Sequence, residues 1–353
     1  MNSRLRNAHC QLRERNLDGF LVSLPANISY LTDASSRDSY LLVSLKGNVY
    51  FTDSRYTEEA GVFLKGNARL KECNGFVFGR IAEEILKLKI KNVGFEERCL
   101  PFAEFASLND FSRGKFKLIP VHGIVEDKRQ VKDQGEILKI KKAVRIAASA
   151  LRHIKKSLVC GMKELEVAAE IERFMRYQGA RGAAFETIVA AGANSSQPHH
   201  IPGSKRIRSG EPVLIDFGAD YQGYKSDLTR VLFLGKINVL VRKVYDIVLK
   251  AQELAIKRIG PGAEMAEIDR VAREYIASKG YGGCFTHNLG HGSGLEIHEA
   301  PYISGRESSA IRPGMVFTVE PGIYLPGKFG IRIEDMVLIT NKGCEVISGS
   351  IDK

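Results

Sequence analysis

The sequence lacks any apolar run that approaches the roughly 20 residues a helix needs to cross a bilayer. Its first apolar stretch, residues 19–24, follows charged and polar residues and is too short for the core of a signal peptide. These two absences argue against a helical membrane protein and against export. We therefore expect a cytoplasmic protein without a membrane partner.

Cysteine is sparse, and charge of one sign is never concentrated. The six cysteines are far apart and form no Cys-x-x-Cys pair, which fits a reducing compartment. The net charge is +11, but Lys and Arg are spread along the chain with no stacking aromatic residues between them. We therefore expect a solvated basic surface and no nucleic-acid partner.

The length of 353 residues predicts two domains, and 44% hydrophobic and 26% charged residues are typical of a globular protein. Residues 1–127 alternate apolar runs with amphipathic segments, which predicts an α/β amino-terminal domain. Its strands are expected at 19–24, 40–44, 49–52 and 92–96, and its helices at 5–16, 54–64 and 80–88. A polar linker at 125–133 then leads into a second domain, 128–353.

The second domain contains an internal repeat. One predicted helix pair comprises a long amphipathic helix that ends near Gly161 and a helix at 162–178, and the other comprises helices at 239–259 and 265–278. Residues 160–172 resemble residues 259–269, and strands follow each pair. An α+β domain with a pseudo-two-fold repeat is therefore expected.

Five residues of this domain stand in short apolar stretches beside glycines: Asp216, Asp227, His291, Glu320 and Glu334. Any one of them alone could be an ordinary acid or histidine at the end of a strand. A buried carboxylate is costly, however, unless it is paired or binds a metal. Four carboxylates and one imidazole at a single point would form a hard, oxygen-rich site suited to a pair of divalent ions.

The spacing of these residues supports convergence. Residues 218–224 are predicted to form the turn of a hairpin, which would place Asp216 directly opposite Asp227 on one face. Arg332 and Glu334 are two residues apart in a strand and would also share a face. Arg332 is therefore expected to hold Glu334, to pair with a substrate carboxylate, or to form a purely structural ion pair.

Four motifs carry a resemblance to a known family. They are Asp-Phe-Gly-Ala-Asp-Tyr-Gln-Gly-Tyr-Lys-Ser-Asp-Leu-Thr-Arg (216–230), Gly-His-Gly-Ser-Gly-Leu-Glu-Ile-His-Glu-Ala-Pro (290–301), Thr-Val-Glu-Pro-Gly-Ile-Tyr (318–324) and Arg-Ile-Glu-Asp (332–335). They resemble the motifs of the pita-bread metallopeptidases, and most of all the Xaa-Pro dipeptidases (prolidases) and X-Pro aminopeptidases (aminopeptidase P). The resemblance implies a pita-bread catalytic domain, a homodimer, and proline-containing dipeptides or peptides as substrates.

The resemblance also implies roles for single residues. The five residues above would be the ligands of two divalent ions, with Mn²⁺ favoured on hardness and Co²⁺ or Zn²⁺ as alternatives. Glu320 would carry a proton from the attacking water to the leaving proline nitrogen. Three histidines and one arginine would contact the substrate, and two of these histidines, His199 and His298, would stabilise the charge that develops during catalysis; the four residues are His199, His287, His298 and Arg332. His200 points the other way in an extended segment and is given no role.

Three alternatives remain open. The enzyme could trim Xaa-Pro from longer peptides instead of splitting dipeptides. It could be a metal-free hydrolase of the creatinase type, or an inactive peptide-binding module built on the same fold. The last two predict lost ligands, and none of the five positions is lost here.

Overall fold

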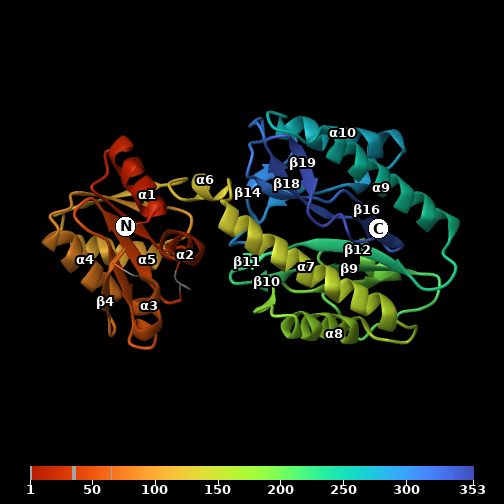
Figure 1. Ribbon diagram of the computed structural model, residues 1–353, viewed down its shortest axis with the longest axis horizontal. Helices are drawn as coiled ribbons and strands as arrows, with labels where there is room; N and C mark the ends of the chain where they lie inside the picture. The colour runs from red at the N-terminus through yellow and green to blue at the C-terminus, as the bar shows by residue number, and fades with distance from the viewer. Residues whose placement is uncertain (1, 34–36, 65) are drawn as a thin grey trace. The chain divides into compact units, whose positions relative to one another are not determined.

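The computed structural model describes residues 2–33, 37–64 and 66–353. The chain forms two compact units, Met1–Arg129 and Gln130–Lys353, whose elements can be followed by colour in Figure 1. Within the described residues, no helix combines the length and the apolar character that a membrane span would require.

The first unit contains a six-stranded mixed sheet. Its strand order is β4 (Arg69–Glu72), β3 (Val49–Thr52), β2 (Tyr40–Ser44), β1 (Gly19–Val22), β5 (Asn92–Glu96) and β6 (Lys117–Val121). The helices are α1 (Ser3–Glu14), α2 (Pro25–Thr32), α3 (Thr57–Leu64), α4 (Val77–Lys87), α5 (Phe102–Ser112) and α6 (Glu126–Arg129). Ile81 and Ile85, one turn apart on α4, are buried in a core with Leu21 and Phe51. The α/β character expected from the sequence is confirmed.

Two helix pairs frame the second unit: α7 (Gln134–Ser157) with α8 (Glu164–Tyr177), and α9 (Val239–Arg258) with α10 (Met265–Ser278) (Figure 1). A capping box starts α7, because Asp133 accepts from the backbone N–H of Glu136 and the Glu136 side chain accepts from the N–H of Asp133. One face of α7, with Ile140, Ala147 and Leu151, is buried.

The strands of the second unit form two larger sheets and two small ones. The larger sheets have the orders β12 (Leu228–Phe233), β9 (Pro212–Phe217), β8 (Ile188–Ala191), and β14 (Glu299–Ile303), β13 (Gly290–Gly292), β15 (Val316–Val319), β18 (Asp335–Thr340), β19 (Gly343–Val346). The small sheets comprise β11 (Tyr224–Lys225), β10 (Ala219–Tyr221) and β7 (Gly182–Ala183), and β16 (Gly322–Leu325) with β17 (Phe329–Arg332). Two 3₁₀ helices, η1 (Gly192–Ser196) and η2 (Gly282–Cys284), complete the unit.

The predicted repeat is visible in the strand pairing. The order β12-β9-β8 of the first half recurs as β18-β15-β13 in the second, and each strand in these sets is antiparallel to its neighbour. In each half, the residue before the second helix forms an isolated bridge with a residue shortly before the middle strand: Lys163 with Arg206, and Glu264 with Ala310. The pseudo-two-fold architecture follows from this shared pairing.

The hairpin that carries Asp216 differs from the prediction. Asp216 pairs with Thr229, and the two-residue turn lies at 222–223, between β10 and β11. Asp216 and Asp227 are therefore not directly opposite, because the strands continue past Gly218 before they turn. The register differs by an even number of residues, so Asp227 stays on the face of Asp216.

Candidate metal centre

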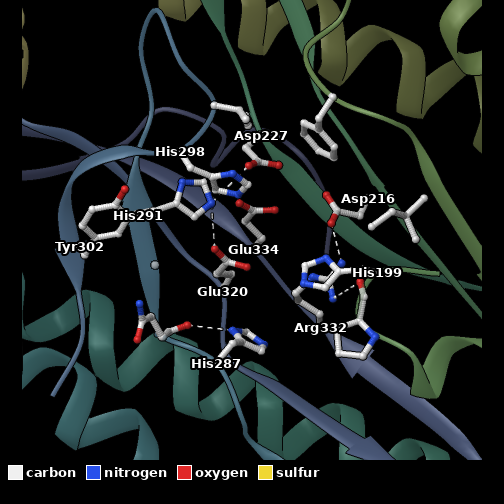
Figure 2. Close-up of a pocket in the computed structure, with 16 residues that line it drawn as sticks. His199, Asp216, Asp227, His287, His291, His298, Tyr302, Glu320, Arg332 and Glu334 are labelled. Atoms are coloured by element: carbon white, nitrogen blue, oxygen red, sulfur yellow. Dashed lines mark hydrogen bonds and ion pairs between the residues drawn. The ribbon is translucent and has the colours of Figure 1, made fainter. Parts of the chain in front are cut away.

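A cavity of about 240 Å³ opens among the strands of the second unit and collects nearly every residue singled out from the sequence. Figure 2 shows their side chains turned toward it from both halves of the repeat. The lining includes the nine predicted site residues His199, Asp216, Asp227, His287, His291, His298, Glu320, Arg332 and Glu334. We call Asp216, Asp227, His291, Glu320 and Glu334 the acidic cluster.

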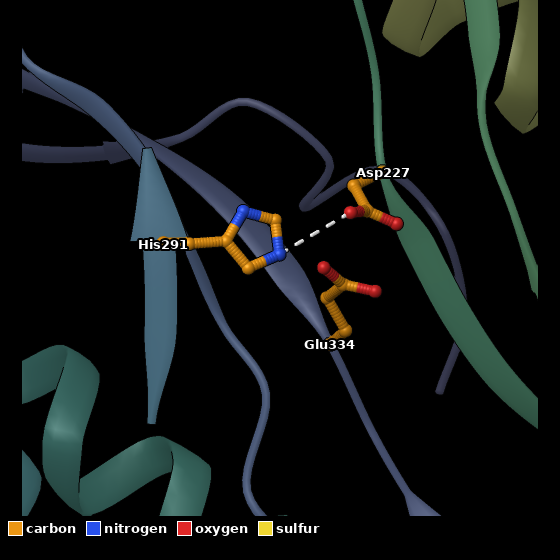
Figure 3. Close-up of side chains that lie close together, drawn as sticks. All are labelled: Asp227, His291 and Glu334. Carbon is orange, nitrogen blue, oxygen red and sulfur yellow. Dashed lines mark ion pairs between the residues drawn. The ribbon is translucent and has the colours of Figure 1, made fainter. Parts of the chain in front are cut away.

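Three members of the acidic cluster lie close enough to share one ion. One potential ligand atom from each of Asp227, His291 and Glu334 lies within 4.8 Å of the other two (Figure 3). His291 Nε2 is 3.6 Å from Asp227 Oδ2 and 3.2 Å from Glu320 Oε1. Glu320 therefore adjoins the same group, and the imidazole stands between carboxylates from the two halves.

The repeat explains where the four carboxylates lie. The middle strands of the two matching sets are β9 and β15. Asp216 is the fifth residue counted from the start of β9, and Glu320, which directly follows β15, is the fifth counted from the start of β15. Asp227 and Glu334 each directly precede the third strand, β12 and β18. Each half of the repeat thus contributes two acids, and the two halves place them at equivalent positions. His291 breaks the symmetry, since the corresponding residue of β8 is Ala190.

Strand alternation turns Asp216 toward the cavity. Val213, Ile215 and Phe217 of β9 pack in the core beneath α7 and α8, whereas Leu214 belongs to the core on the opposite face. Asp216 shares the face of Leu214. The apolar residues around it therefore fix the direction of a carboxylate that is only 8% exposed.

Glycines flank His291, and the neighbouring strands require them. A Cβ at Gly290 would collide with the backbone carbonyl of Thr318, and a Cβ at Gly292 with the backbone of Ala300. The glycines therefore allow β13 to lie close against its two neighbouring strands.

Burial dominates the electrostatics of the acidic cluster. It raises the pKa of Asp227 well above its usual range, and the charges of Glu334, Asp216 and Glu320 raise it further. Burial likewise raises the pKa of Glu334, with Glu320 and Asp216 adding to the effect. Burial also disfavours the Glu320 carboxylate, but the hydrogen bond and charge of His291 outweigh it and hold the Glu320 pKa at about 2.

The carboxylates have unused acceptor atoms. Asp216 Oδ1, Asp227 Oδ1 and Glu334 Oε1 are buried and have no hydrogen-bond partner among the residues the structure describes. Buried acceptors are normally satisfied, and an uncompensated one is costly. Oxygen atoms from four acids beside one imidazole match the preference of hard divalent cations, so the residues present fit such ions.

Arg332 forms a direct ion pair with Asp216, whereas Glu334 was the acid named in one of its three expected roles. Its Nη2 lies 2.5 Å from Asp216 Oδ2, and its Nη1 donates to the Tyr324 hydroxyl at 2.7 Å. It reaches Glu334 only through Thr229, whose hydroxyl accepts from Arg332 Nε and donates to Glu334 Oε2. Arg332 thus orients two acids, one directly and one through a hydroxyl.

His287 lies at the other end of this hydrogen-bonded chain. Its Nδ1 faces the carbonyl of Asn288 at 2.8 Å and so carries the proton, which leaves Nε2 to accept from the Tyr324 hydroxyl at 3.0 Å. Burial lowers the pKa of His287 and favours this neutral form. Burial and the neighbouring His291, whose ring centroid is 4.3 Å away, also lower the pKa of His298.

Tyr324 and Glu164 support this wall of the cavity, and neither had a predicted role. Tyr324, the last residue of the motif at 318–324, links His287 to Arg332. Glu164, which is fully buried on α8, accepts from the Ala191 N–H, from the Asn194 side chain and from His200 Nε2. His200 therefore helps to fix the loop that presents His199, and only the three-dimensional pairing reveals this.

Comparison with known proteins decides the family. Residues 138–341 match the model described as metallopeptidase family M24, and residues 4–131 match the creatinase/prolidase N-terminal domain. The chain belongs to metallopeptidase family M24. The pita-bread catalytic domain and the peptidase class predicted from the motifs are confirmed for this M24 protein.

Similar proteins cover the M24 chain from end to end. A Xaa-Pro dipeptidase of Pyrococcus horikoshii is 36% identical over 97% of this chain and 96% of its own length. A solved Xaa-Pro dipeptidase from Bacillus anthracis has a TM-score of 0.95 at 37% identity, covering 99% and 98% of the two chains. The X-Pro aminopeptidase structure from Thermotoga maritima has a TM-score of 0.87 at 40% identity, covering 95% and 97%.

Proposed function

We propose that this M24 metallopeptidase hydrolyses the peptide bond before proline, in Xaa-Pro dipeptides or at the N-terminus of Xaa-Pro peptides, with two divalent metal ions. The observation that carries the proposal is the acidic cluster, with three buried carboxylate oxygens that no described residue satisfies. Relatives named Xaa-Pro dipeptidase and X-Pro aminopeptidase support the substrate class.

The five members of the acidic cluster would hold the ions, and Mn²⁺ suits a mainly carboxylate donor set. Bound divalent cations would lower the pKa of a shared water molecule toward neutrality and polarise the substrate carbonyl. Asp227 and Glu334 must lose their protons to act as ligands, and the cations' charge favours that loss.

Glu320 acts as the proton carrier in this proposal. Its carboxylate lines the cavity beside His291, where it could accept a proton from the attacking water and release it to the proline nitrogen of the leaving group. His199 and His298 line the same cavity, and a neutral His298 can donate a hydrogen bond to the oxygen on which negative charge develops.

His287 and Arg332, which Tyr324 links to each other, line the side of the cavity that would receive the proline residue. A proline nitrogen has no N–H and its amide is tertiary, so recognition depends on a shaped pocket instead of a hydrogen bond to that nitrogen. The interlinked side chains keep that shape because each one is held by its neighbour.

The test is a peptidase assay of the Mn²⁺-reconstituted protein on an Ala-Pro dipeptide, an Ala-Pro-Ala tripeptide and a longer Ala-Pro peptide. An Ala-Ala dipeptide is the matched control. Hydrolysis confined to the bond before proline would support the proposal, and the ratio of the three rates would divide dipeptidase from aminopeptidase. Equal cleavage of Ala-Ala, or no cleavage of any peptide, would overturn it.

A further inference from the structure

Residues 285–289, which we call the His287 segment, join η2 to β13 without belonging to a helix or strand. The segment presents His287 to the cavity, and the backbone carbonyl of its last residue, Leu289, accepts from the N–H of Glu320. An irregular segment has no ladder to satisfy its backbone groups, so other groups must fix its path.

Two side chains of α10 supply those contacts. Arg273 donates from Nη1 to the Phe285 carbonyl at 3.0 Å and from Nη2 to the His287 carbonyl at 2.9 Å. Asp269 accepts from the Leu289 N–H at 3.1 Å. Three alternate residues of the segment are thus bound through their backbones, and the guanidinium also lies 4.3 Å from the centre of the Phe285 ring.

Arg273 and Asp269 also bind each other. Arg273 Nε and Nη2 donate to the two carboxylate oxygens of Asp269, both at 2.8 Å. Asp269 is 1% exposed, so this bidentate pair is largely shielded from water on the acidic side. The fork fixes the plane of the guanidinium, and that plane determines where the two carbonyls can lie.

The pair has no counterpart in the other half of the repeat. Helices α8 and α10 have the same length, and in both cases the residue before the helix forms an isolated bridge. Matching the two helix starts aligns Asp269 with Ala168 and Arg273 with Glu172. Packing interactions that α8 and α10 have in common therefore do not explain the pair. What Asp269 and Arg273 contact in the second half is the His287 segment.

We propose that Asp269 and Arg273 are positioning residues, which set the orientation of His287 toward the substrate from outside the cavity. This inference rests on the substrate-binding role proposed for His287. Loss of Arg273 should therefore weaken substrate binding more than it slows the chemical step, because Asp269 still binds the N–H of Leu289, whose carbonyl accepts from the N–H of Glu320.

The experiment compares Arg273→Met, which keeps an apolar stem, with Arg273→Lys, whose single ammonium cannot bridge the carboxylate and both carbonyls. We expect Arg273→Met to raise KM for Ala-Pro about tenfold while kcat changes less than about threefold, with a smaller KM increase for Arg273→Lys. Arg270→Met is the matched control, because Arg270 forms an exposed i,i+4 pair with Glu274 on the same helix. It should leave both constants unchanged.

A double-mutant cycle separates positioning from general loosening. In a His287→Ala background, Arg273→Met should have little further effect on KM, because the residue it positions is gone. An undiminished effect in that background would overturn the proposal, as would an unchanged KM in the single variant.

Amide hydrogen exchange of the metal-free protein provides a readout that needs no activity. Arg273→Met should speed exchange of the Leu289 amide, whose N–H is bound by Asp269, by about tenfold or more and leave β15 unaffected. Unchanged exchange of that amide would contradict the positioning role. If the parent protein cleaves no peptide but Arg273→Met still speeds the exchange, the proposed function is refuted and the positioning of the segment is retained.

Discussion

At the scale of single residues, site residues could be predicted where a charged side chain stands in an otherwise apolar stretch of sequence. Asp216 and Glu334 stand in strands that are otherwise apolar, and such a conflict is costly unless a function resolves it. The partner of Arg332 was not predictable, because the choice between Glu334 and Asp216 depends on which strands meet. Sequence spacing gives the face of a strand but not its neighbour.

Replacing His298 or His199 by Ala should lower kcat about ten- to a thousand-fold, because each would remove a stabiliser of developing charge. Metal content should stay normal in both variants. His153→Ala is the control, since this histidine stacks on Phe174 between α7 and α8. Unchanged kcat in both variants would remove these two histidines from the proposed mechanism.

Arg332→Lys should weaken metal binding and reduce kcat/KM for dipeptides and longer peptides alike. The reason is that the guanidinium is 4% exposed and engages Asp216, Tyr324 and Thr229 at once, which an ammonium cannot do. The measurement is kcat/KM for both substrate lengths at limiting and saturating Mn²⁺. A KM increase restricted to dipeptides would show instead that Arg332 binds the substrate carboxylate.

At the scale of elements, hydrophobic periodicity predicted the helices well and the loops hardly at all. The strand Tyr40–Ser44 and the helix Met265–Ser278 have the predicted bounds, because their patterns are local. The loop that carries His199 is instead fixed by Glu164, which lies far from it in sequence. Such side-chain anchoring of irregular backbone leaves no periodic signal in the chain.

The anchoring of that loop predicts a stability effect. Glu164→Ala would leave several buried donors without an acceptor, and it should cost on the order of 3 kcal/mol in the free energy of unfolding. Urea unfolding followed by circular dichroism measures the shift. Glu166→Ala on the same helix is the control, because its half-exposed side chain should cost about 1 kcal/mol or less. Equal shifts for the two variants would refute the anchoring role of Glu164.

At the scale of the whole catalytic unit, the repeat brings four acids together from two halves, and this has a consequence for stability. In the metal-free protein, the raised pKa values of Asp227 and Glu334 keep them protonated at a pH where unfolded carboxyls have lost their protons. The unfolded chain then binds fewer protons than the folded one. Stability of the metal-free protein must therefore fall as pH rises above about 4 to 5.

Metal ions replace those protons, so the gain in Tm on adding Mn²⁺ should increase between about pH 5 and about pH 8. Scanning calorimetry of the protein with Mn²⁺ and with EDTA measures this gain at each pH. A Tm gain that is the same at every pH would show that the buried acids do not exchange protons for metal.

Elemental analysis tests most directly the claim that the acidic cluster is a metal centre. After reconstitution with Mn²⁺ and removal of the excess, the protein should retain about two ions per chain, and Asp227→Ala should retain fewer. A well-folded parent protein that retains no divalent metal would contradict the account at its centre, because the proposed hydrolysis depends on those ions.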